Sequence, residues 1–366
     1  DFLIVDEGDL LERELLSFAS IELSKKSFSL CDEELPVVSS VYDARRWARR
    51  LLPKFTQRAM QAEADARADM SFLKRALRMR TNLKKLKQLS AVDPSKWVLQ
   101  KTLFGYSIQP LWADSFAKDY VLRHADKVLI MSATLPPPEI YARLLGIDEP
   151  FQYIEAPCLF PLENRPVNFW PVARLKGQEL SEFQVNRLVN AIDLILERFP
   201  REKGVVHTVS YKLRDAILRH SRYPSRFISH NDGQDSLGRE EALERFLNTK
   251  EPRVLLSPSM ERGVDLRDDS ARFNIVSKFP FPSMGDPQVK ARMKLDPDWY
   301  AAATADALVQ SCGRSVRHKD DYSVTFILDG QEWFFRRYKR FFPAWFRDAV
   351  VKIKTLEEAR LPPMMR

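Results

Sequence analysis

The sequence predicts an α/β fold in which parallel β-strands alternate with helices, divided between two domains. Short apolar segments that are typical of buried strands recur between longer segments with helical periodicity. This alternation is characteristic of parallel sheets whose strands are joined by right-handed helical crossovers. A chain of 366 residues is also long enough to form two hydrophobic cores.

The first part of the chain contains two predicted strands, on either side of a long helical region. Phe2–Val5 is apolar and ends at two carboxylates, and residues 127–135 form a second buried strand that ends in small hydroxyl residues. Helices are expected over residues 10–18, 41–89 and 136–145. Pro53 and Pro94 mark expected breaks near the ends of the helices in the basic region.

The rest of the chain alternates more regularly. Residues 152–176 are extended and contain proline, and we interpret them as the crossing into the second domain. Strands are predicted over residues 204–211, 227–230, 254–257, 273–277 and 322–329. Helices are predicted over residues 183–199, 212–220, 238–247, 299–307 and 333–342. We therefore expect residues 1–20 and 100–150 to form an incomplete first domain, 21–99 a helical basic insertion, and 151–366 the second domain.

Composition favours a polyanionic partner. The 58 Lys and Arg residues exceed the 50 Asp and Glu residues, giving a net charge of +8 and a pI near 9.3. Cys31, Cys158 and Cys312 are too few and too far apart for a disulfide framework, and the five histidines show no ligand spacing. These features predict reduced thiols and a cytoplasmic protein, with neither a signal peptide nor a membrane span. Since the chain begins with Asp1 in a core-like strand, we expect it to come from the interior of a longer protein.

The strand Phe2–Val5 delivers Asp6 and Glu7 at its carboxyl end. Two carboxylates in this position are typical of a Walker B motif, in which the Asp holds Mg²⁺ and the Glu activates the attacking water. The alternative is a strand followed by an acidic helix N-terminus, which the helix dipole also favours.

Hydroxyl residues follow two further strands. Ser132 and Thr134 lie at the end of the strand predicted over 127–135, where they either couple a Mg²⁺ site to the second domain or simply cap the next helix. Thr208, Ser210 and Tyr211 precede the helix at 212–220, where hydroxyls and helix N-terminal amides can hold a phosphate.

The stretch Gln-Ser-Cys-Gly-Arg-Ser-Val-Arg over residues 310–317 carries Gln310, Arg314 and Arg317. On a helix, two arginines three residues apart lie on one face, where planar guanidinium groups suit a polyphosphate. The alternative is an exposed helix with two solvated arginines.

The region 41–89 combines an apolar seam with many basic residues. Phe72, Ala76, Met79, Leu83 and Leu86 fall at spacings of four and three, as expected for helix packing. Two basic groups accompany them, one around Trp47 (Arg45, Arg46, Arg49 and Arg50) and one that includes Arg75 and Arg78. These faces are either solvated surfaces of a helical hairpin or a path for a nucleic-acid backbone.

The order of these motifs, completed by Glu261-Arg-Gly-Val-Asp265, resembles that of superfamily 2 helicases and most closely the XPD/DinG family. The residues that carry the resemblance are Asp126 to Leu135, Phe279-Pro-Phe-Pro282 with Asp286-Pro287, and the stretch from Gln310 to Tyr322 with its Arg-His-Lys-Asp-Asp-Tyr extension. The resemblance covers residues 2–9 and about 108–343. The helical residues between them match the family's arch insertion by position and helicity.

The resemblance implies tandem RecA-like domains, the first incomplete and carrying an arch-like insertion. It also implies an ATP-dependent DNA helicase or translocase that uses ATP and Mg²⁺ and moves 5′ to 3′ on single-stranded or forked DNA. Such a protein would be associated with the nucleoid in bacteria or located in the nucleus in eukaryotes. By this resemblance Asp6 and Glu7 hold Mg²⁺, and Ser132 and Thr134 couple ATP to DNA.

The remaining roles also follow from the resemblance. Gly263 and Asp265 contact the nucleotide, and Gln310, Arg314 and Arg317 face the γ-phosphate. The DNA contacts expected from the resemblance are Thr208, Ser210, Tyr211 and Arg262. Arg75 and Arg78 are expected to contact DNA because of the basic character of their helix, not by the resemblance.

Three features depart from the family pattern. No GxxxxGK[ST] phosphate loop occurs in the sequence. The usual Asp-Glu-Ala-His is replaced by Asp6-Glu7-Gly8-Asp9, and three cysteines cannot hold the iron–sulfur cluster of many members. We therefore expect a helicase fragment that does not hydrolyse ATP alone.

Two other functions remain open. One is a nucleic-acid-binding module without ATPase activity, derived from a split or degenerate helicase. The other is an RNA helicase of the DEAD-box kind, which fits less well because the expected Asp-Glu-Ala-Asp is not present.

Overall fold

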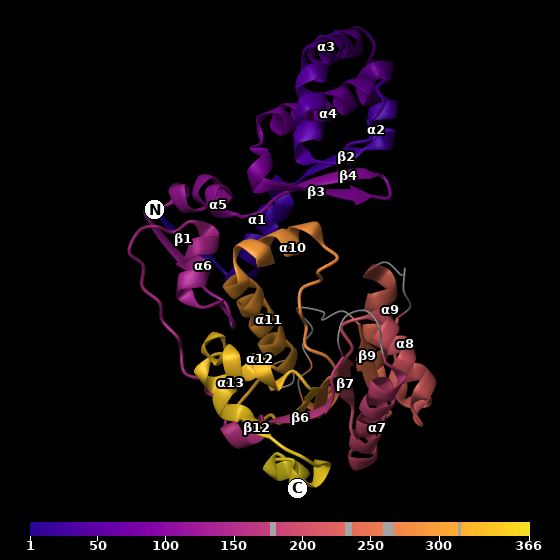
Figure 1. The fold of residues 1–366 in the computed structure, drawn as a ribbon, viewed down its shortest axis with the longest axis vertical. Coiled ribbons are helices and arrows are strands. Elements are labelled where there is room, and N and C mark those ends of the chain that lie inside the picture. The colour runs from indigo at the N-terminus through magenta and orange to yellow at the C-terminus, as the bar shows by residue number, and fades with distance from the viewer. Residues whose placement is uncertain (176–180, 231–235, 259–265, 267, 314–315) are drawn as a thin grey trace. The chain divides into compact units, whose positions relative to one another are not determined.

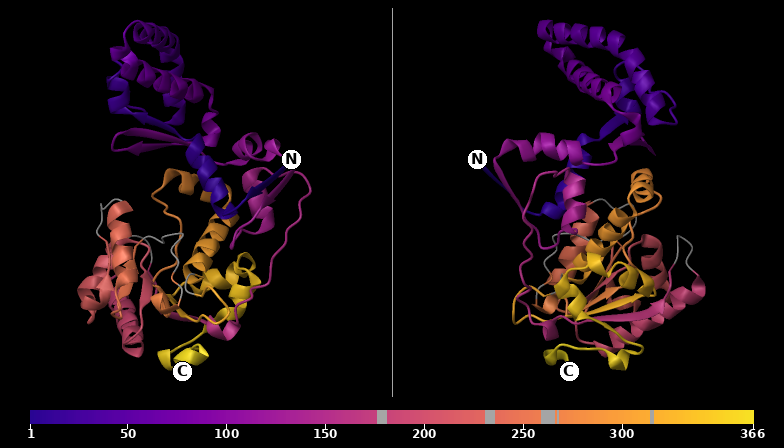
Figure 2. Two further views of the ribbon diagram at one scale, coloured as in Figure 1. Left: turned by 180° about the vertical axis from the view of Figure 1, so that it is seen from behind. Right: turned by 60° about the vertical axis from the view of Figure 1, so that its left-hand side comes forward.

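Three β-sheets organise the part of the chain that the structure describes. The computed structural model describes residues 1–175, 181–230, 236–258, 266, 268–313 and 316–366, without the side chains of residues 236 and 237. Its contacts divide the chain into two units, Asp1–Gln152 with Pro282–Tyr300, and Tyr153–Phe281 with Ala301–Arg366. Figures 1 and 2 show the elements of both units. No helix in the described ranges is long and apolar enough to cross a membrane.

The second unit contains a parallel sheet. Among its described residues, seven strands lie in the order β12-β6-β11-β10-β7-β9-β8, and every neighbouring pair is parallel. The strands are β6 (Val167–Ala173), β7 (Gly204–His207), β8 (Phe227–Ile228), β9 (Val254–Ser257), β10 (Phe273–Val276), β11 (Val324–Asp329) and β12 (Val350–Lys352). Most of their residues are buried, as is usual for parallel strands covered on both faces. The predicted parallel α/β fold is confirmed.

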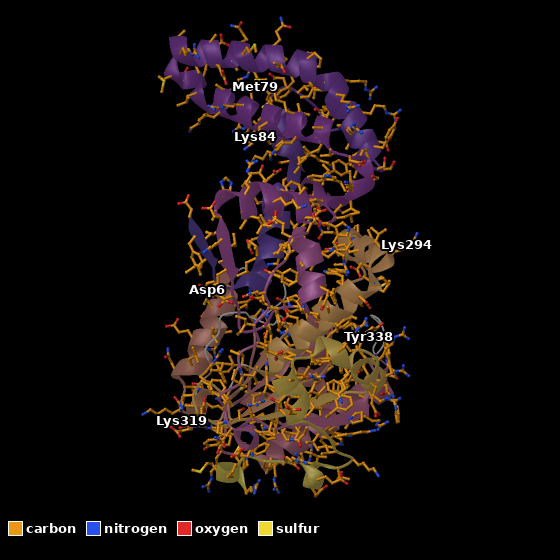
Figure 3. The ribbon with its side chains drawn as sticks, turned by 90° about the vertical axis from the view of Figure 1, so that its left-hand side faces the viewer. Asp6, Met79, Lys84, Lys294, Lys319 and Tyr338 are labelled. Atoms are coloured by element: carbon orange, nitrogen blue, oxygen red, sulfur yellow. The ribbon has the colours of Figure 1, made fainter. Side chains whose placement is uncertain are left out.

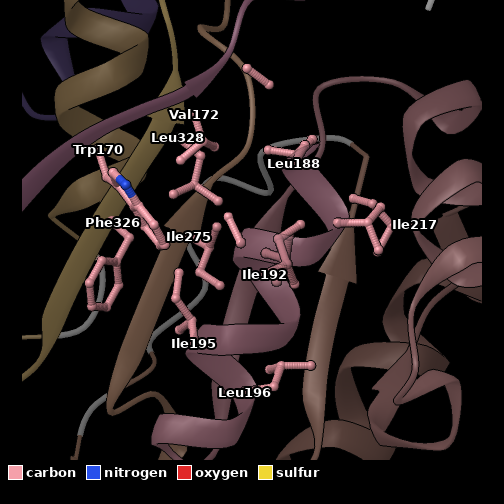
Figure 4. Close-up of a cluster of buried hydrophobic side chains, with 14 of the residues drawn as sticks. Trp170, Val172, Leu188, Ile192, Ile195, Leu196, Ile217, Ile275, Phe326 and Leu328 are labelled. Carbon is pink, nitrogen blue, oxygen red and sulfur yellow. The ribbon is translucent and has the colours of Figure 1, made fainter. Parts of the chain in front are cut away.

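Helices connect and cover these strands. They are α7 (Glu182–Arg198), α8 (Tyr211–His220), α9 (Ser236–Asn248), α11 (Pro297–Cys312), α12 (Glu332–Arg337) and α13 (Ala344–Ala349). The apolar side of α7 faces the sheet, where Leu188, Ile192 and Ile195 are fully buried in one cluster with Ile275 and Phe326 (Figure 4). The helix predicted over 333–342 is shorter than expected, because α12 ends at Arg337 and a 3₁₀ turn follows.

The predicted crossing at 152–176 contains a strand of the sheet that the prediction missed. β6 lies between β11 and β12 although Pro171 stands inside it. The register of β6 with β11 shifts between Ile327 and Asp329. Proline cannot donate a hydrogen bond to the ladder, and such an irregularity is one of the places where a sheet tolerates it.

The first unit contains a parallel pair of strands, β1 (Phe2–Val5) and β5 (Lys127–Ile130). The helices α1 (Leu11–Ala19), α5 (Asp114–Tyr120) and α6 (Pro138–Leu145) pack with this pair around Leu15, Leu16 and Leu145. The strand Phe2–Val5 and the helices predicted over 10–18 and 136–145 are confirmed within two residues, whereas the strand predicted over 127–135 ends earlier, at Ile130.

The basic region forms two long helices, α3 (Val41–Ala68) and α4 (Leu73–Ala91), which pack side by side. Ser40 caps α3 by accepting a hydrogen bond from the amide of Asp43 at 3.1 Å. The buried face of α3 is rich in alanine, which lets α4 approach closely, and α4 buries Ala76, Met79 and Leu86 against it. The break predicted at Pro53 is wrong, since α3 continues through it with Leu51 and Phe55 buried on either side. Burial of these side chains offsets the hydrogen bond that proline lacks.

The insertion is not wholly helical, contrary to the prediction for residues 21–99. β2 (Ile21–Ser24), β4 (Gly105–Pro110) and β3 (Trp97–Thr102) form a three-stranded antiparallel sheet beside the short helix α2 (Lys25–Ser29). Ile21, Leu23 and Ile108 of this sheet share a core with α3 and α4. At the hairpin, Gly105 has φ 152°, and a Cβ there would lie 1.9 Å from the carbonyl oxygen of Leu23.

Residues Pro282–Tyr300, which the sequence places in the second domain, group with the first unit. Within them α10 (Pro287–Leu295) begins at Asp286, whose side chain accepts from the amide of Gln288 at 2.7 Å. Arg292 of α10 is buried and pairs with Glu12 of α1. This ion pair is one of the contacts that join the segment to the first unit, together with the hydrogen bond from Gln288 Nε2 to the carbonyl of Pro110 at 2.6 Å.

Candidate nucleotide and nucleic-acid sites

The carboxylate pair lies at the end of the β1–β5 sheet. Val5 is opposite Ile130 in the parallel ladder, so Asp6 and the residues after Ile130 leave the sheet at the same edge. Asp6 and Glu7 are both exposed there. The carboxyl end of a parallel sheet is where this class of fold binds ligands.

The turn that carries the carboxylates is fixed by backbone bonds. Glu7 adopts a left-handed conformation, with φ 52° and ψ 42°, which costs a non-glycine residue about 1 kcal/mol. Its amide donates to Asp6 Oδ1 at 2.8 Å, and the amide of Gly8 donates to the carbonyl of Met131 at 2.9 Å. These bonds hold both carboxylates beside the segment that follows β5.

Gly8 explains one departure from the family pattern. A Cβ at this position would lie 2.3 Å from Cγ2 of Ile130, so an alanine requires Ile130 to move. The hydroxyl of Tyr141 also donates to the carbonyl of Gly8, and burial raises the pKa of Tyr141, which keeps it a donor. The third position of the motif is therefore small because β5 and α6 pack directly onto it.

Asp9, the fourth residue of the Asp6-Glu7-Gly8-Asp9 motif, has a hydrogen-bond partner in the turn after β5. Ser132 Oγ donates to Asp9 Oδ1 at 2.7 Å, and the amide of Thr134 donates to Ser132 Oγ at 3.4 Å. Two motifs more than 120 residues apart, the acidic turn and the Ser-Ala-Thr turn, are thus joined by one hydrogen bond. No local sequence pattern predicts this bond, because it depends on which turns share a sheet edge.

Carboxylate oxygens are the ligands that Mg²⁺ prefers, and it keeps several waters. Asp6 and Glu7 fit such an ion, because both are exposed and fixed by the turn. A second set of groups lies in the other unit, where ligand atoms of Asp268, His318 and Asp321 are within 4.8 Å of one another. Asp321 does not suit a metal, since both its oxygens already accept hydrogen bonds from the protein.

The arginine stretch in the second unit is not wholly helical, so the prediction that Arg314 and Arg317 share one helix face is wrong for Arg317. α11 ends at Cys312, before Gly313, and Arg317 lies outside any helix. Gln310 is on the last turn of α11, and its Nε2 donates to Asp306 Oδ2 at 3.3 Å. The other predicted residues, Arg314, Arg262, Gly263 and Asp265, lie outside the described residues.

A buried carboxylate that sequence reasoning missed anchors the segment after α11. Asp321 is fully buried and accepts from the amide of Arg317 at 3.2 Å and from Nη1 of Arg272 at 2.9 Å. It also accepts from the amides of Asp268 and Tyr322, and Arg272 lies over the Tyr322 ring at 3.8 Å. The Asp-Asp-Tyr extension of the motif therefore positions the backbone of Arg317.

The hydroxyl residues after β7 are in three different environments. Thr208 is fully buried, and its hydroxyl donates to the carbonyls of Ser210 at 3.1 Å and Ser257 at 3.2 Å. Ser210 caps α8 by accepting from the amide of Leu213, and the hydroxyl of Tyr211 bonds His230 Nε2 at 3.1 Å. Ser210 and Tyr211 are the partly exposed members of the group.

The two predicted arch arginines also differ. Arg75 is exposed and pairs with Asp32 at 2.6 Å, whereas Arg78 is half-buried. An exposed pair of this kind contributes little to stability, which leaves Arg75 available to an anion.

Comparison with known proteins connects these features. Residues 195–349 match a family model described as a helicase C-terminal domain. The chain is 26% identical over 278 residues to the ATP-dependent DNA helicase YoaA of Escherichia coli (strain K12), covering 70% of this chain and 41% of that protein. It is 24% identical over 345 residues to the helicase of the same name from Haemophilus influenzae, covering 87% and 48%.

A solved structure titled XPD helicase matches with a TM-score of 0.60 at 14% identity, covering 96% of this chain and 68% of that one. The chain is a member of the XPD/DinG family of superfamily 2 helicases. Its parallel sheets match the tandem RecA-like domains of the XPD helicase fold. The chain spans less than half the length of these two curated relatives.

Proposed function

We propose that this member of the XPD/DinG family acts as an ATP-dependent DNA helicase or translocase that moves 5′ to 3′ on single-stranded DNA. The observation that carries the proposal is the exposed Asp6–Glu7 pair, held by the Gly8–Met131 and Asp9–Ser132 hydrogen bonds beside the Ser-Ala-Thr turn. A solvated binding surface needs neither a carboxylate pair at a sheet end nor a bond that joins it to a second motif.

The proposal gives the residues distinct roles. Asp6 holds Mg²⁺ through its water shell, and Glu7 orients the attacking water. Ser132 and Thr134 couple the nucleotide to DNA, with Asp9 as the connecting acceptor. Residues that act on the nucleotide phosphates are Gln310, Arg314, Arg317, Gly263 and Asp265. Residues that contact DNA are Thr208, Ser210, Tyr211, Arg262, Arg75 and Arg78.

Hydrolysis requires a phosphate loop that the 366 residues do not contain. Backbone amides of such a loop cradle the β- and γ-phosphates. Asp6 and Glu7 cannot replace these amides, because carboxylates are negatively charged and repel phosphates. The proposal is therefore that another segment supplies this loop. The alternative function, a nucleic-acid-binding module without ATPase activity, is favoured by the same missing motif.

ATP hydrolysis distinguishes the two functions. We would measure turnover of this chain, and of the chain extended upstream along its gene, with and without single-stranded DNA. DNA-stimulated turnover in the extended form alone is expected for the helicase. DNA binding without turnover in either form would establish the binding module.

Two variants test the assigned roles in the active form. Glu7→Gln abolishes turnover if Glu7 orients the water, and Arg317→Ala lowers it on the order of 10³-fold if its guanidinium offsets charge on the γ-phosphate. DNA binding survives in both variants. Turnover near the wild-type value in either would reject the role assigned to that residue.

A further inference from the structure

The first turns of α3 carry a concentrated group of cations that the proposed function does not use. Arg45, Arg46, Arg49 and Arg50 line a surface hollow of about 270 Å³ together with the exposed ring of Tyr42. Arginines four residues apart are neighbours on a helix and are separated by about 6 Å along its axis. Figure 3 shows many side chains with terminal nitrogen atoms along α3 and α4. Met79 and Lys84, which the figure labels, lie on α4.

Contacts with other parts of the unit orient these guanidinium groups. Arg45 and Arg49 both donate Nε to the carbonyl of Ser90 at the end of α4, at 3.4 and 3.0 Å. Within the described residues, their Nη1 and Nη2 groups have no protein partner, so the two-nitrogen fork remains available. Preorganised side chains lose less entropy when they bind a ligand.

Arg46 is oriented in another way. It pairs with Asp43 at 2.9 Å and lies over the Tyr42 ring at 5.3 Å. Asp43 itself accepts hydrogen bonds from Ser39 at 2.9 Å and Ser40 at 2.7 Å, which lower its pKa. Its charge is therefore partly satisfied before it meets the arginine.

The hollow has a surplus of positive charge. Asp93 is the other carboxylate near Arg45, and it already accepts from the amide and hydroxyl of Ser95 at 3.0 and 2.8 Å. Asp43 beside Arg46 and Asp93 near Arg45 thus already accept hydrogen bonds from serines, and the lining of the hollow contains four arginines. This surplus of positive charge favours a ligand with several anionic groups.

We propose that this hollow, formed by Tyr42, Arg45, Arg46, Arg49 and Arg50, binds the phosphodiester backbone of single-stranded nucleic acid. Guanidinium forks match phosphate oxygens, and an exposed phenol ring beside them provides a surface on which a base stacks. The inference extends the proposed function by naming a further DNA contact, and it rests on that function for the identity of the ligand. An acidic polypeptide would use the arginines but gain little from the ring.

The test measures binding of a fluorescent oligothymidylate by fluorescence anisotropy at several salt concentrations. In Arg46→Gln/Arg50→Gln two exposed cations are lost. Affinity should fall roughly tenfold, and the slope of log K against log salt should become shallower by about 1.4, because each single-strand phosphate contact contributes about 0.7. The matched control is Arg187→Gln/Arg198→Gln on α7, which removes the same charge and includes an arginine 5.8 Å from the exposed Phe183 ring. That control should change affinity less than twofold.

Tyr42→Leu tests the base-stacking role against Phe183→Leu. We expect a loss of at least fivefold for Tyr42→Leu and no loss for the control. Loss in the arginine variant without loss in Tyr42→Leu would overturn the base-stacking role and reduce the site to a purely electrostatic contact with the backbone. Wild-type binding that both sets of variants retain would reject this hollow and leave the helicase proposal standing. Failure of the unaltered chain to bind DNA would reject both.

Discussion

Asp329 is a fully buried carboxyl at the end of β11. Its Oδ2 accepts from the amide of Phe279 at 2.8 Å, while burial raises the pKa of Asp329 to about 7. The pKa of Asp in an unfolded chain is about 3.9. Between about pH 4 and 7, Asp329 is therefore protonated more often in the folded chain than in the unfolded chain. Stability therefore falls as pH rises through this window, because the ionised form is the one that burial disfavours.

We expect the contribution of Asp329 to the free energy of unfolding to decrease by about 1.4 kcal/mol per pH unit across that window. Asp329→Asn keeps an acceptor for Phe279 and removes the titration. Urea denaturation at pH 5 and pH 7 should therefore show a smaller pH dependence in Asp329→Asn than in the wild type. An equal pH dependence in both proteins would show that Asp329 titrates normally.

At the residue scale, the sequence predicts groups that chemistry requires but not the partners that hold them. Asp6, Glu7 and Ser132 are recognisable because each follows an apolar strand. Asp9 and Asp321 are not, because their acceptor roles depend on which loops meet in the folded chain. A buried ion pair such as Asp321 with Arg272 contains two residues far apart in sequence and has no local pattern.

At the element scale, periodicity predicts the long helices and continuous apolar runs predict the strands. The predicted burial is wrong for β1 and β5, where Phe2, Ile4 and Leu129 are exposed. In the sheet β2-β4-β3, the four-residue strand β2 is separated from the β3–β4 hairpin by the helices α3 and α4, so no local pattern joins its strands. The helix expected through Arg317 ends at Cys312, since Gly313 follows and the segment beyond bonds to Asp321 instead. Local propensity is overridden wherever a contact distant in sequence is stronger.

The α3–α4 pair offers a test of packing at this scale. Ala59 is 2% exposed and lies on the face that α3 buries, whereas its neighbour Met60 is 66% exposed. Ala59→Leu adds volume where the helices are closely packed, so we expect it to lower the free energy of unfolding by about 1–3 kcal/mol. Met60→Leu should change it by less than about 0.5 kcal/mol. Thermal or urea unfolding followed by circular dichroism measures both, and equal stabilities would indicate a loosely packed helix pair.

At the scale of the whole molecule, the chain leaves the second unit after Phe281 and returns to it after Tyr300. The segment between them is held within the first unit by a buried ion pair. Arg292 is 4% exposed, pairs with Glu12, and lies 4.5 Å from the Trp112 ring and 3.8 Å from the Trp299 ring. Burial raises the pKa of Glu12, while the Arg292 guanidinium opposes that rise.

Removing one partner should therefore be worse than removing both. Arg292→Met leaves the Glu12 carboxylate buried without its cation, which we expect to cost about 3–5 kcal/mol. Glu12→Met/Arg292→Met buries no charge and should recover most of that loss, because the Met side chains can pack with Trp112 and Trp299. Arg143→Met serves as the control, since Arg143 is 54% exposed in its pair with Asp296 and its loss should cost under about 1 kcal/mol. The measurement is urea unfolding of the four proteins, together with the rate of proteolysis within Pro282–Tyr300. A double variant no more stable than Arg292→Met would show that the ion pair holds this segment by its geometry rather than by neutralising a buried charge.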